Sequence, residues 1–282
     1  MLNGSSFFQT VKKRRLTLFQ ALVYDINQAI NSQDLKECPL EEIVPKQYDE
    51  FLPLFSKVLA DRLPLHRPGI DHEVRLNDGE TPTWGPLYSM SQTELVVLTE
   101  WLEENMSNGF IQQSSSPFAA PVLFATKPDG GRRFCIDYPD INSKTMKNRY
   151  PLPLIKEMLN LLGKATIYTK LDVRGADNLL RVKEEDEHKL AFRTRYGLFE
   201  LTVMQLGTTN APADFQGYIN NAIREALDDF ASANLENVRI YRDSEEEHVG
   251  HVKWVMQRVL EAGLYLKPEK CKFHKKTVRY LG

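Results

Sequence analysis

The stretch Ala233-Asn234-Leu235-Glu236-Asn237-Val238-Arg239-Ile240-Tyr241 decides the fold of this chain. Val238 and Ile240 alternate with Arg239, which is the period-two pattern of a β-strand with one buried face. Positions 234–237 directly precede this strand, where a tight turn would join it to an earlier strand. Such a turn would carry the carboxylate of Glu236 and the amide of Asn237.

A helix is expected before the hairpin, over residues 211–230. Its apolar side chains recur at helical spacing and would form one buried stripe, made of Phe215, Ile219, Ile223, Leu227 and Phe230. The acidic pair Asp228-Asp229 lies at the end of this stripe. Because that pair continues a helical pattern, the turn between two strands is assigned to residues 234–237.

A second strand is expected at residues 166–173, where the sequence Ile167-Tyr168-Thr169-Lys170-Leu171-Asp172-Val173 is largely apolar or β-branched. Asp172 lies at the end of this strand, where polar side chains often carry function. An isolated aspartate in such a place is more often the start of a turn or a helix cap. The residues alone leave both interpretations open.

A β-hairpin is predicted over residues 120–138, with a turn at Pro128-Asp129-Gly130-Gly131. Lys127 and Arg133 flank the turn, and the planar guanidinium of arginine suits phosphate binding. Two exposed charges beside a turn are an equally ordinary surface feature. Three further helices are expected, at residues 45–63, at 91–109 after the capping-box sequence Ser91-Gln92-Thr93-Glu94, and at 249–263.

Composition excludes several classes of protein. The chain has 282 residues, of which 42% are hydrophobic, enough for one or two cores and about two domains. It contains no apolar run of about 18 residues, so a membrane span is not expected, and its first residues do not resemble a secretion signal. The three cysteines, Cys38, Cys135 and Cys271, are odd in number and far apart, which argues against disulfides or a zinc site.

The net charge of −2 argues against a strongly basic nucleic-acid-binding surface. Local basic clusters occur at residues 12–15 and 267–279. Each cluster could contact phosphates, but charge runs more often form solvated faces.

Several blocks of sequence occur in an order and spacing typical of one family. They are Asn148-Arg149-Tyr150-Pro151-Leu152-Pro153-Leu154-Ile155, Thr169-Lys170-Leu171-Asp172, Ala191-Phe192-Arg193-Thr194-Arg195-Tyr196-Gly197-Leu198-Phe199-Glu200, Gly207-Thr208-Thr209-Asn210-Ala211-Pro212-Ala213-Asp214-Phe215-Gln216, Glu246-Glu247-His248 and Glu261-Ala262-Gly263-Leu264. Over residues 18–282 the chain resembles the Pol reverse transcriptase of gypsy-type LTR retrotransposons of the fungal kind.

The resemblance implies an α/β (α+β) right-hand fold with fingers and palm subdomains and without a thumb. Residues 1–45 would be a linker from the protease–polymerase junction, and residues 46–282 the reverse-transcriptase-like part. The fingers would lie mainly at 90–165 and the palm mainly at 166–282. A protein of this kind would work inside the cell, in the cytoplasm or the nucleus, and not in a membrane.

The resemblance also implies that residues 234–237 form the turn of a β-hairpin, and it implies roles for individual residues. Asp172 matches the first metal ligand, and Glu236 and Asn237 stand where the family has two aspartates that hold Mg²⁺. Two-ion catalysis needs anionic oxygen ligands, so Asp172 and Glu236 would hold Mg²⁺ weakly or not at all. Lys127, Arg133 and Gly207 match nucleotide-binding positions, and Asp177 replaces the aromatic side chain that packs beneath the sugar.

These departures lead to three interpretations of function. The first is a retrotransposon-derived, reverse-transcriptase-like protein that is catalytically inactive. The second is a residually active RNA-directed DNA polymerase, and the third is a nucleic-acid or protein interaction module. The expected partners are an RNA or DNA template-primer, bound weakly and without sequence specificity, and the polymerase of an intact element.

Overall fold

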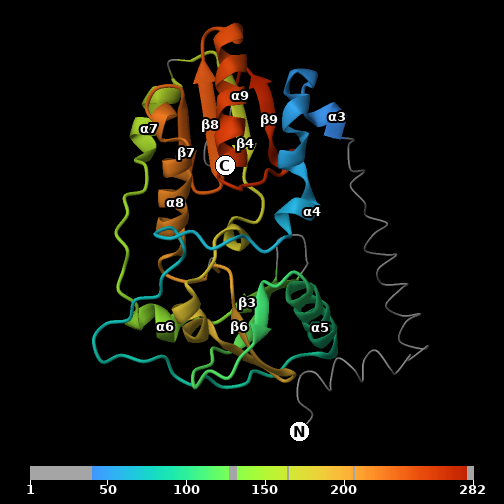
Figure 1. Cartoon of the computed structure of the whole chain (residues 1–282), viewed down its shortest axis with the longest axis vertical. Helices are drawn as coiled ribbons and strands as arrows, with labels where there is room; N and C mark the ends of the chain where they lie inside the picture. The colour runs from blue at the N-terminus through green and yellow to red at the C-terminus, as the bar shows by residue number, and fades with distance from the viewer. Residues whose placement is uncertain (1–39, 127–131, 164, 206, 278–282) are drawn as a thin grey trace, which may run out of the picture.

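The computed structural model describes residues 40–126, 132–163, 165–205 and 207–277 (Figure 1). The basic cluster at 12–15, the linker residues before 40, Cys38 and Lys127 lie outside these ranges. In the described part, the strands form three sheets, in the orders β7-β8-β4-β9, β1-β6-β5 and β2-β3.

The strands and helices alternate irregularly along the chain. The strands are β1 (Ile111–Gln113), β2 (Val122–Thr126), β3 (Arg132–Ile136), β4 (Ile167–Asp172), β5 (Phe192–Thr194), β6 (Gly197–Leu201), β7 (Ala231–Asn234), β8 (Asn237–Arg242) and β9 (Lys272–Lys275). The α-helices are α3 (Leu40–Ile43), α4 (Lys57–Ala60), α5 (Gln92–Ser107), α6 (Pro139–Lys144), α7 (Ile155–Leu162), α8 (Ala211–Ala222) and α9 (Glu245–Glu261). Short 3₁₀ helices are η1 (Lys46–Phe55), η2 (Ala176–Leu179), η3 (Glu184–Leu190), η4 (Arg224–Ala226) and η5 (Pro268–Lys270).

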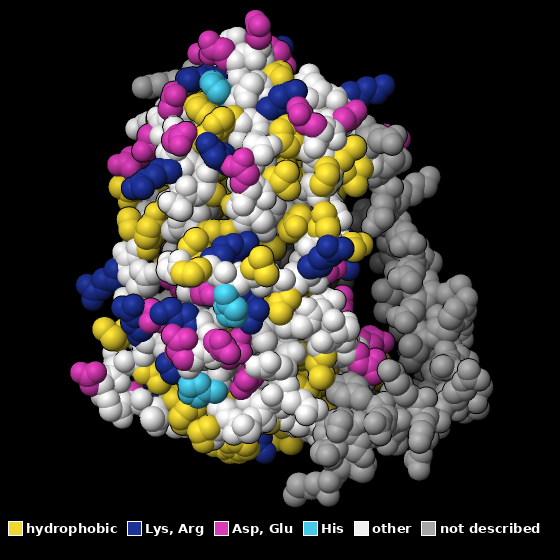
Figure 2. Space-filling model, in the orientation of Figure 1, with side chains coloured by type: hydrophobic (Ala, Val, Ile, Leu, Met, Phe, Trp, Pro, Cys, Tyr) yellow, Lys and Arg dark blue, Asp and Glu magenta, His cyan; other side chains and the backbone are white. Residues whose placement is uncertain are grey.

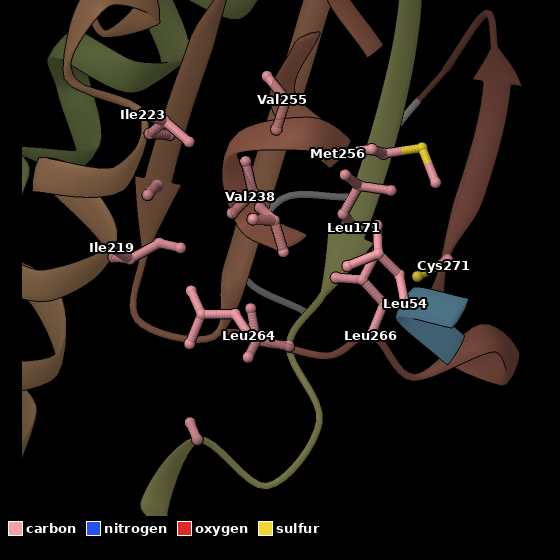
Figure 3. Packing of buried hydrophobic residues seen from close by; sticks show 14 of the residues in the cluster. Leu54, Leu171, Ile219, Ile223, Val238, Val255, Met256, Leu264, Leu266 and Cys271 are labelled. Atoms are coloured by element: carbon pink, nitrogen blue, oxygen red, sulfur yellow. The ribbon is translucent and has the colours of Figure 1, made fainter. Parts of the chain in front are cut away.

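The four-stranded sheet β7-β8-β4-β9, called the large sheet below, is antiparallel throughout. Leu171 and Val238 project from one face into a core that also contains side chains of α8 and α9 (Figure 3). Ile240 belongs to the same core. Side chains alternate along a strand, so Lys170, Asp172, Asn237 and Arg239 belong to the opposite face. We call this second face the open face, because it becomes exposed toward Lys272 of β9, although Asp172 and Arg239 on it are buried.

A second core lies around the two smaller sheets and α5, in the lower half of Figure 1. Ser91 caps α5 through the expected capping box, and Gly109, with φ +76°, follows the end of the helix. Strands β2 and β3 form the predicted hairpin, with Ala125 opposite Arg133. Trp101 of α5 stacks on Phe134 at a ring-centroid distance of 3.9 Å, which joins the hairpin to the helix.

Two of the expected helices are interrupted. The helix expected at 211–230 ends at Ala222; a 3₁₀ turn follows, and Asp228 takes φ +65°. The chain must reverse here to enter β7, and Phe230 packs against His251 with ring centroids 3.8 Å apart. The helix expected at 45–63 is a 3₁₀ helix that is kinked at Tyr48 and is followed by α4. Pro53 within it removes one backbone donor.

The cysteines in the described ranges are free: Cys271 is buried and Cys135 is partly buried. Within the same ranges, no helix is long and apolar enough to cross a membrane. On the face shown in Figure 2, Lys and Arg side chains are interspersed with Asp and Glu side chains. That face therefore has no field of a single sign to attract a polyanion.

Candidate functional site

The predicted hairpin is present, and its turn contains two residues. Asn234 pairs with Asn237, and Leu235 and Glu236 form the loop between β7 and β8. Leu235 takes a left-handed conformation, with φ +50°, which is unusual for a residue with a branched side chain.

Gln216 of α8 holds this turn from the core side. Its side-chain oxygen accepts a hydrogen bond from the Leu235 N–H at 2.8 Å, and its amide nitrogen donates to the Ala233 carbonyl at 3.2 Å. Gln216 is fully buried, so these bonds satisfy polar groups that water does not reach. No role for Gln216 was predicted from the sequence. The one hint in the sequence is that Gln216 is a polar residue next to Phe215, which belongs to the predicted buried stripe.

Asp172 and Asn237 are direct partners across β4 and β8. The Val173 N–H donates to the Glu236 carbonyl at 2.7 Å, next to this pair. In an antiparallel sheet this pattern defines a non-hydrogen-bonded pair, in which the two side chains lie closest. The structure thus brings together Asp172, Glu236 and Asn237 at one end of the large sheet.

The carboxylate of Asp172 is enclosed by two lysines. Lys170 Nζ lies 3.2 Å from Oδ2, and Lys270 Nζ lies 3.7 Å from Oδ1. Asp172 is only 2% exposed, and Oδ1 accepts no hydrogen bond from the described residues. The lysines supply the positive charge that a buried carboxylate requires.

Cys271 lies beside Asp172 on the core side. Its sulfur accepts a hydrogen bond from the Asp172 N–H at 3.4 Å. Burial raises the pKa of the Cys271 thiol to about 12. Cys271 is therefore a neutral packing residue and not a thiolate metal ligand.

The donor set around Asp172 is a poor fit for two Mg²⁺ ions. Asp172 and Glu236 provide carboxylates, whereas Asn237 provides only an amide oxygen. Lys170 and Lys270 compete with a cation for the Asp172 oxygens. Ligand charge sets the affinity of a hard cation, so the neutral amide of Asn237 and the two ammonium groups beside Asp172 both work against a two-ion arrangement.

The other residues singled out from sequence belong to other elements of the fold. Arg133 is exposed on the β2–β3 hairpin, in a different sheet from Asp172. Asp177 follows the left-handed Gly175 within η2. Gly207 accepts a hydrogen bond at its carbonyl from the Asn142 side chain at 2.9 Å.

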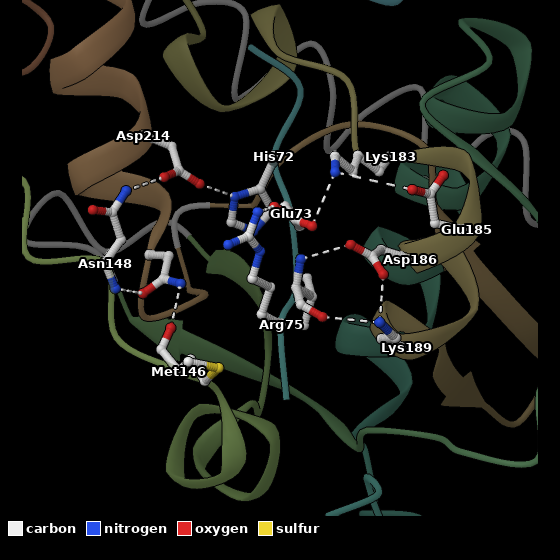
Figure 4. Close-up of polar contacts among 12 residues, drawn as sticks. His72, Glu73, Arg75, Met146, Asn148, Lys183, Glu185, Asp186, Lys189 and Asp214 are labelled. Carbon is white, nitrogen blue, oxygen red and sulfur yellow. Dashed lines mark hydrogen bonds and ion pairs between the residues drawn. The ribbon is translucent and has the colours of Figure 1, made fainter. Parts of the chain in front are cut away.

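A polar network that the sequence interpretation missed connects α8 to residues 72–75 (Figure 4). His72 is buried, with Nδ1 2.6 Å from Asp214 Oδ2 and Nε2 3.1 Å from Thr208 Oγ1. Asn148 donates to the other Asp214 oxygen at 2.6 Å. The network borders a cleft of about 660 Å³.

This network has a structural explanation. It fixes the segment around His72 and the loop at Asn148 to the first turn of α8. The space beside Thr208 and His72 is only about 10 Å³, too small for a substrate. His72 and Asp214 are 142 residues apart in the sequence, and no local sequence pattern predicts a contact over that separation.

A second buried histidine lies between α9 and the core face of the large sheet. His248 Nε2 lies 2.8 Å from Thr169 Oγ1, and the His248 side chain is fully buried. Burial, and then the neighbouring His274, lower the pKa of His248 from 6.5 to about 4. The imidazole is therefore neutral at physiological pH.

The chain matches one family model, described as reverse transcriptase (RNA-dependent DNA polymerase), over residues 125–282. Curated relatives include the Transposon Tf2-3 and Tf2-7 polyproteins of Schizosaccharomyces pombe. Each is 33% identical over 294 aligned positions that cover 100% of this chain and 22% of the relative. The chain thus spans about a fifth of the length of these relatives.

Solved structures of similar fold include two foamy viral protease–reverse transcriptases. One, in complex with an RNA/DNA hybrid, has a TM-score of 0.75 at 16% identity and covers 92% of this chain and 34% of that one. The other, a mutant of the prototype foamy virus protein, has a TM-score of 0.74 at 20% identity and covers 87% and 35%. At these identities the likeness concerns the fold alone.

Proposed function

The chain belongs to the reverse transcriptase family, as a reverse-transcriptase-like region of an LTR retrotransposon polyprotein, and from this premise we propose that it binds nucleic acid without carrying out templated DNA synthesis. In this proposal the large sheet with α8 and α9 is the palm. The β2–β3 hairpin with α5 belongs to the fingers, and residues before about 46 are a linker.

The observation that carries the proposal is the pairing of Asp172 with Asn237. A two-ion mechanism clamps the attacking and leaving oxygens between cations held by carboxylates. At the position opposite Asp172 this chain offers a neutral amide, and the adjacent Glu236 is one methylene longer than aspartate. Removing a single electrostatic stabiliser from an active site costs about 10²–10³ in rate, and a metal-ligating carboxylate should matter more.

Asp177 supports the same conclusion. It stands where the family has an aromatic side chain beneath the sugar of the incoming nucleotide. A carboxylate there would repel the triphosphate and would not pack against the ribose. We assign Lys127, Arg133 and Gly207 to the remaining nucleotide contacts.

Nucleic acid is the proposed partner, because the palm and fingers scaffold is retained and a structure of the same fold is described in complex with an RNA/DNA hybrid. Binding should be modest and without sequence specificity, since the chain carries a net charge of −2. As part of a retrotransposon polyprotein, the region would act inside the cell, in the cytoplasm or nucleus. The polymerase of an intact element is a further proposed partner.

A second candidate function is residual RNA-directed DNA polymerase activity. The observation in its favour is Asp172 Oδ1, which is buried and accepts no hydrogen bond from the described residues. A single cation could replace Lys270 there. The hairpin that Gln216 supports is also well formed.

Primer extension on an RNA template with Mg²⁺ and with Mn²⁺ tests the proposal. We expect the unmodified chain to incorporate no more nucleotide than Asp172→Ala. Incorporation by the unmodified chain that Asp172→Ala abolishes would establish polymerase activity instead. A melting curve for each protein ensures that a loss of signal does not reflect unfolding.

A further inference from the structure

Three cationic side chains lie in one row across the open face of the large sheet. Lys170 of β4 is paired with Arg239 of β8 on one side and with Lys272 of β9 on the other. Paired residues of antiparallel strands project to the same face. The row is set by the strand register, whereas in sequence Lys170 is far from both partners.

Such a row is costly unless anions compensate it, because like charges directly opposite each other destabilise a sheet. Asp172 compensates part of this charge. Its two oxygens face Lys170 at 3.2 Å and Lys270 at 3.7 Å. One carboxylate therefore compensates two ammonium groups, and Lys272 is the cross-strand neighbour of Lys170.

Access to the row increases toward β9. Arg239 is 5% exposed, whereas the Lys170 and Lys270 side chains are 24% and 48% exposed. Lys272 is also exposed. A solvent anion could thus reach Lys170, Lys270 and Lys272, whereas Arg239 is buried.

We propose that the open face at Lys170, Lys270 and Lys272 is a metal-independent binding site for phosphate groups. This inference rests on the proposed function and names the chemistry of its ligand. Where the family places metal ions between carboxylates and phosphate, the ammonium groups of this chain provide the positive charge themselves. The neutral Asn237 contributes by removing an anion that would repel the phosphate.

Phosphate could come from the backbone of a nucleic acid or from a free nucleotide. The two sources are separated by measuring binding of inorganic triphosphate by calorimetry and of a short labelled oligothymidylate by fluorescence anisotropy. Both measurements are made on the full chain in EDTA, so that no divalent cation takes part. If only the oligonucleotide binds, the site holds a nucleic-acid backbone; if triphosphate also binds, it holds free nucleotides.

The decisive variants are Lys272→Gln and the double variant Lys170→Gln/Lys270→Gln. We expect each variant to weaken binding in EDTA by about fivefold or more. For the oligonucleotide, the slope of log K against log salt concentration should become shallower by about 0.7 for each phosphate that the variant no longer neutralises. Lys272→Gln leaves both Asp172 ion pairs in place, so it remains informative if the double variant fails to fold. Lys253→Gln is the matched control, because Lys253 on α9 pairs with Glu50 at 2.8 Å and lies outside the row.

Asn237→Asp provides a test of opposite sign. It adds a carboxylate opposite Asp172 and should weaken binding of both phosphate ligands in EDTA. The inference is overturned if neither ligand binds in EDTA. It is also overturned if Lys272→Gln and the double variant Lys170→Gln/Lys270→Gln bind as tightly as Lys253→Gln. Primer extension by the unmodified chain would instead contradict the proposed function, so the two failures are distinguishable.

Discussion

Asp172, the last residue of β4, lies directly opposite Asn237, the first residue of β8, as a non-hydrogen-bonded pair of the large sheet. An amide and a carboxylate are thus neighbours at the positions that we propose to correspond to metal ligands in the family. Lys170 and Lys270 beside Asp172 add positive charge at the same place. The site is therefore better suited to an anion than to a pair of cations.

The double change Glu236→Asp/Asn237→Asp should strengthen Mn²⁺ binding by about tenfold or more, because it adds one negative charge beside Asp172. Titration followed by electron paramagnetic resonance measures this affinity without any need for catalysis. The control is Asn160→Asp, which adds the same charge at an exposed position on α7 and should leave the Mn²⁺ affinity unchanged. Equal affinities for the unmodified chain and the double variant would show that the amide is not what limits metal binding.

Gln216→Ala should lower the free energy of unfolding by about 1–3 kcal/mol, because it leaves the Leu235 N–H and the Ala233 carbonyl without their partner. Urea unfolding measures the change. The control is Gln257→Ala, since Gln257 is exposed on α9 and, among the described residues, its side chain donates to Glu261 of the same helix. That change should cost about 0.5 kcal/mol or less. A Gln216 variant as stable as the control would mean that water replaces both bonds.

His248 should make the protein less stable in acid. Its pKa is lowered to about 4 in the folded chain, whereas in the unfolded chain it is near 6.5. The unfolded state therefore binds more protons between these values, and stability is lost as the pH falls through that window. The loss by pH 5 should be roughly 2 kcal/mol.

His248→Gln removes the titrating group and should flatten the stability profile between pH 6.5 and 4, as measured by urea unfolding at each pH. His188→Gln is the control, because His188 is exposed on η3. The control should keep the slope of the unmodified chain. A slope that is the same in all three proteins would remove His248 as its source.

Leu171→Ala should destabilise the chain by about 2–5 kcal/mol, since it empties a fully buried site between the large sheet and the helices. Leu152→Ala is the matched change at a leucine that is 50% exposed, and it should cost far less. Thermal unfolding of both variants measures the difference. Similar losses would indicate that residues near Leu152 are packed more tightly than the structure shows.

Local sequence patterns predicted much of the fold. The hairpin at 234–237, the strand ending at Asp172 and the capping box at Ser91 are confirmed. The prediction of continuous helices at 45–63 and 211–230 is wrong. The first is kinked at Tyr48 and contains Pro53, and in the second the chain reverses at Asp228, so apolar periodicity alone did not decide the helix boundaries. The roles assigned to Asp172, Glu236, Asn237 and Arg133 remain predictions.

The sequence by itself determined the family, the turn that carries Glu236 and Asn237, and the neutral amide at position 237. Such features depend on residue identity and on neighbours a few positions apart. Only the tertiary structure decided that Asn237 faces Asp172, that Lys270 reaches the Asp172 carboxylate, and that Gln216 supports the turn. These contacts join residues far apart in sequence, and they form because burying apolar faces of the strands and helices fixes the register in which the polar side chains meet.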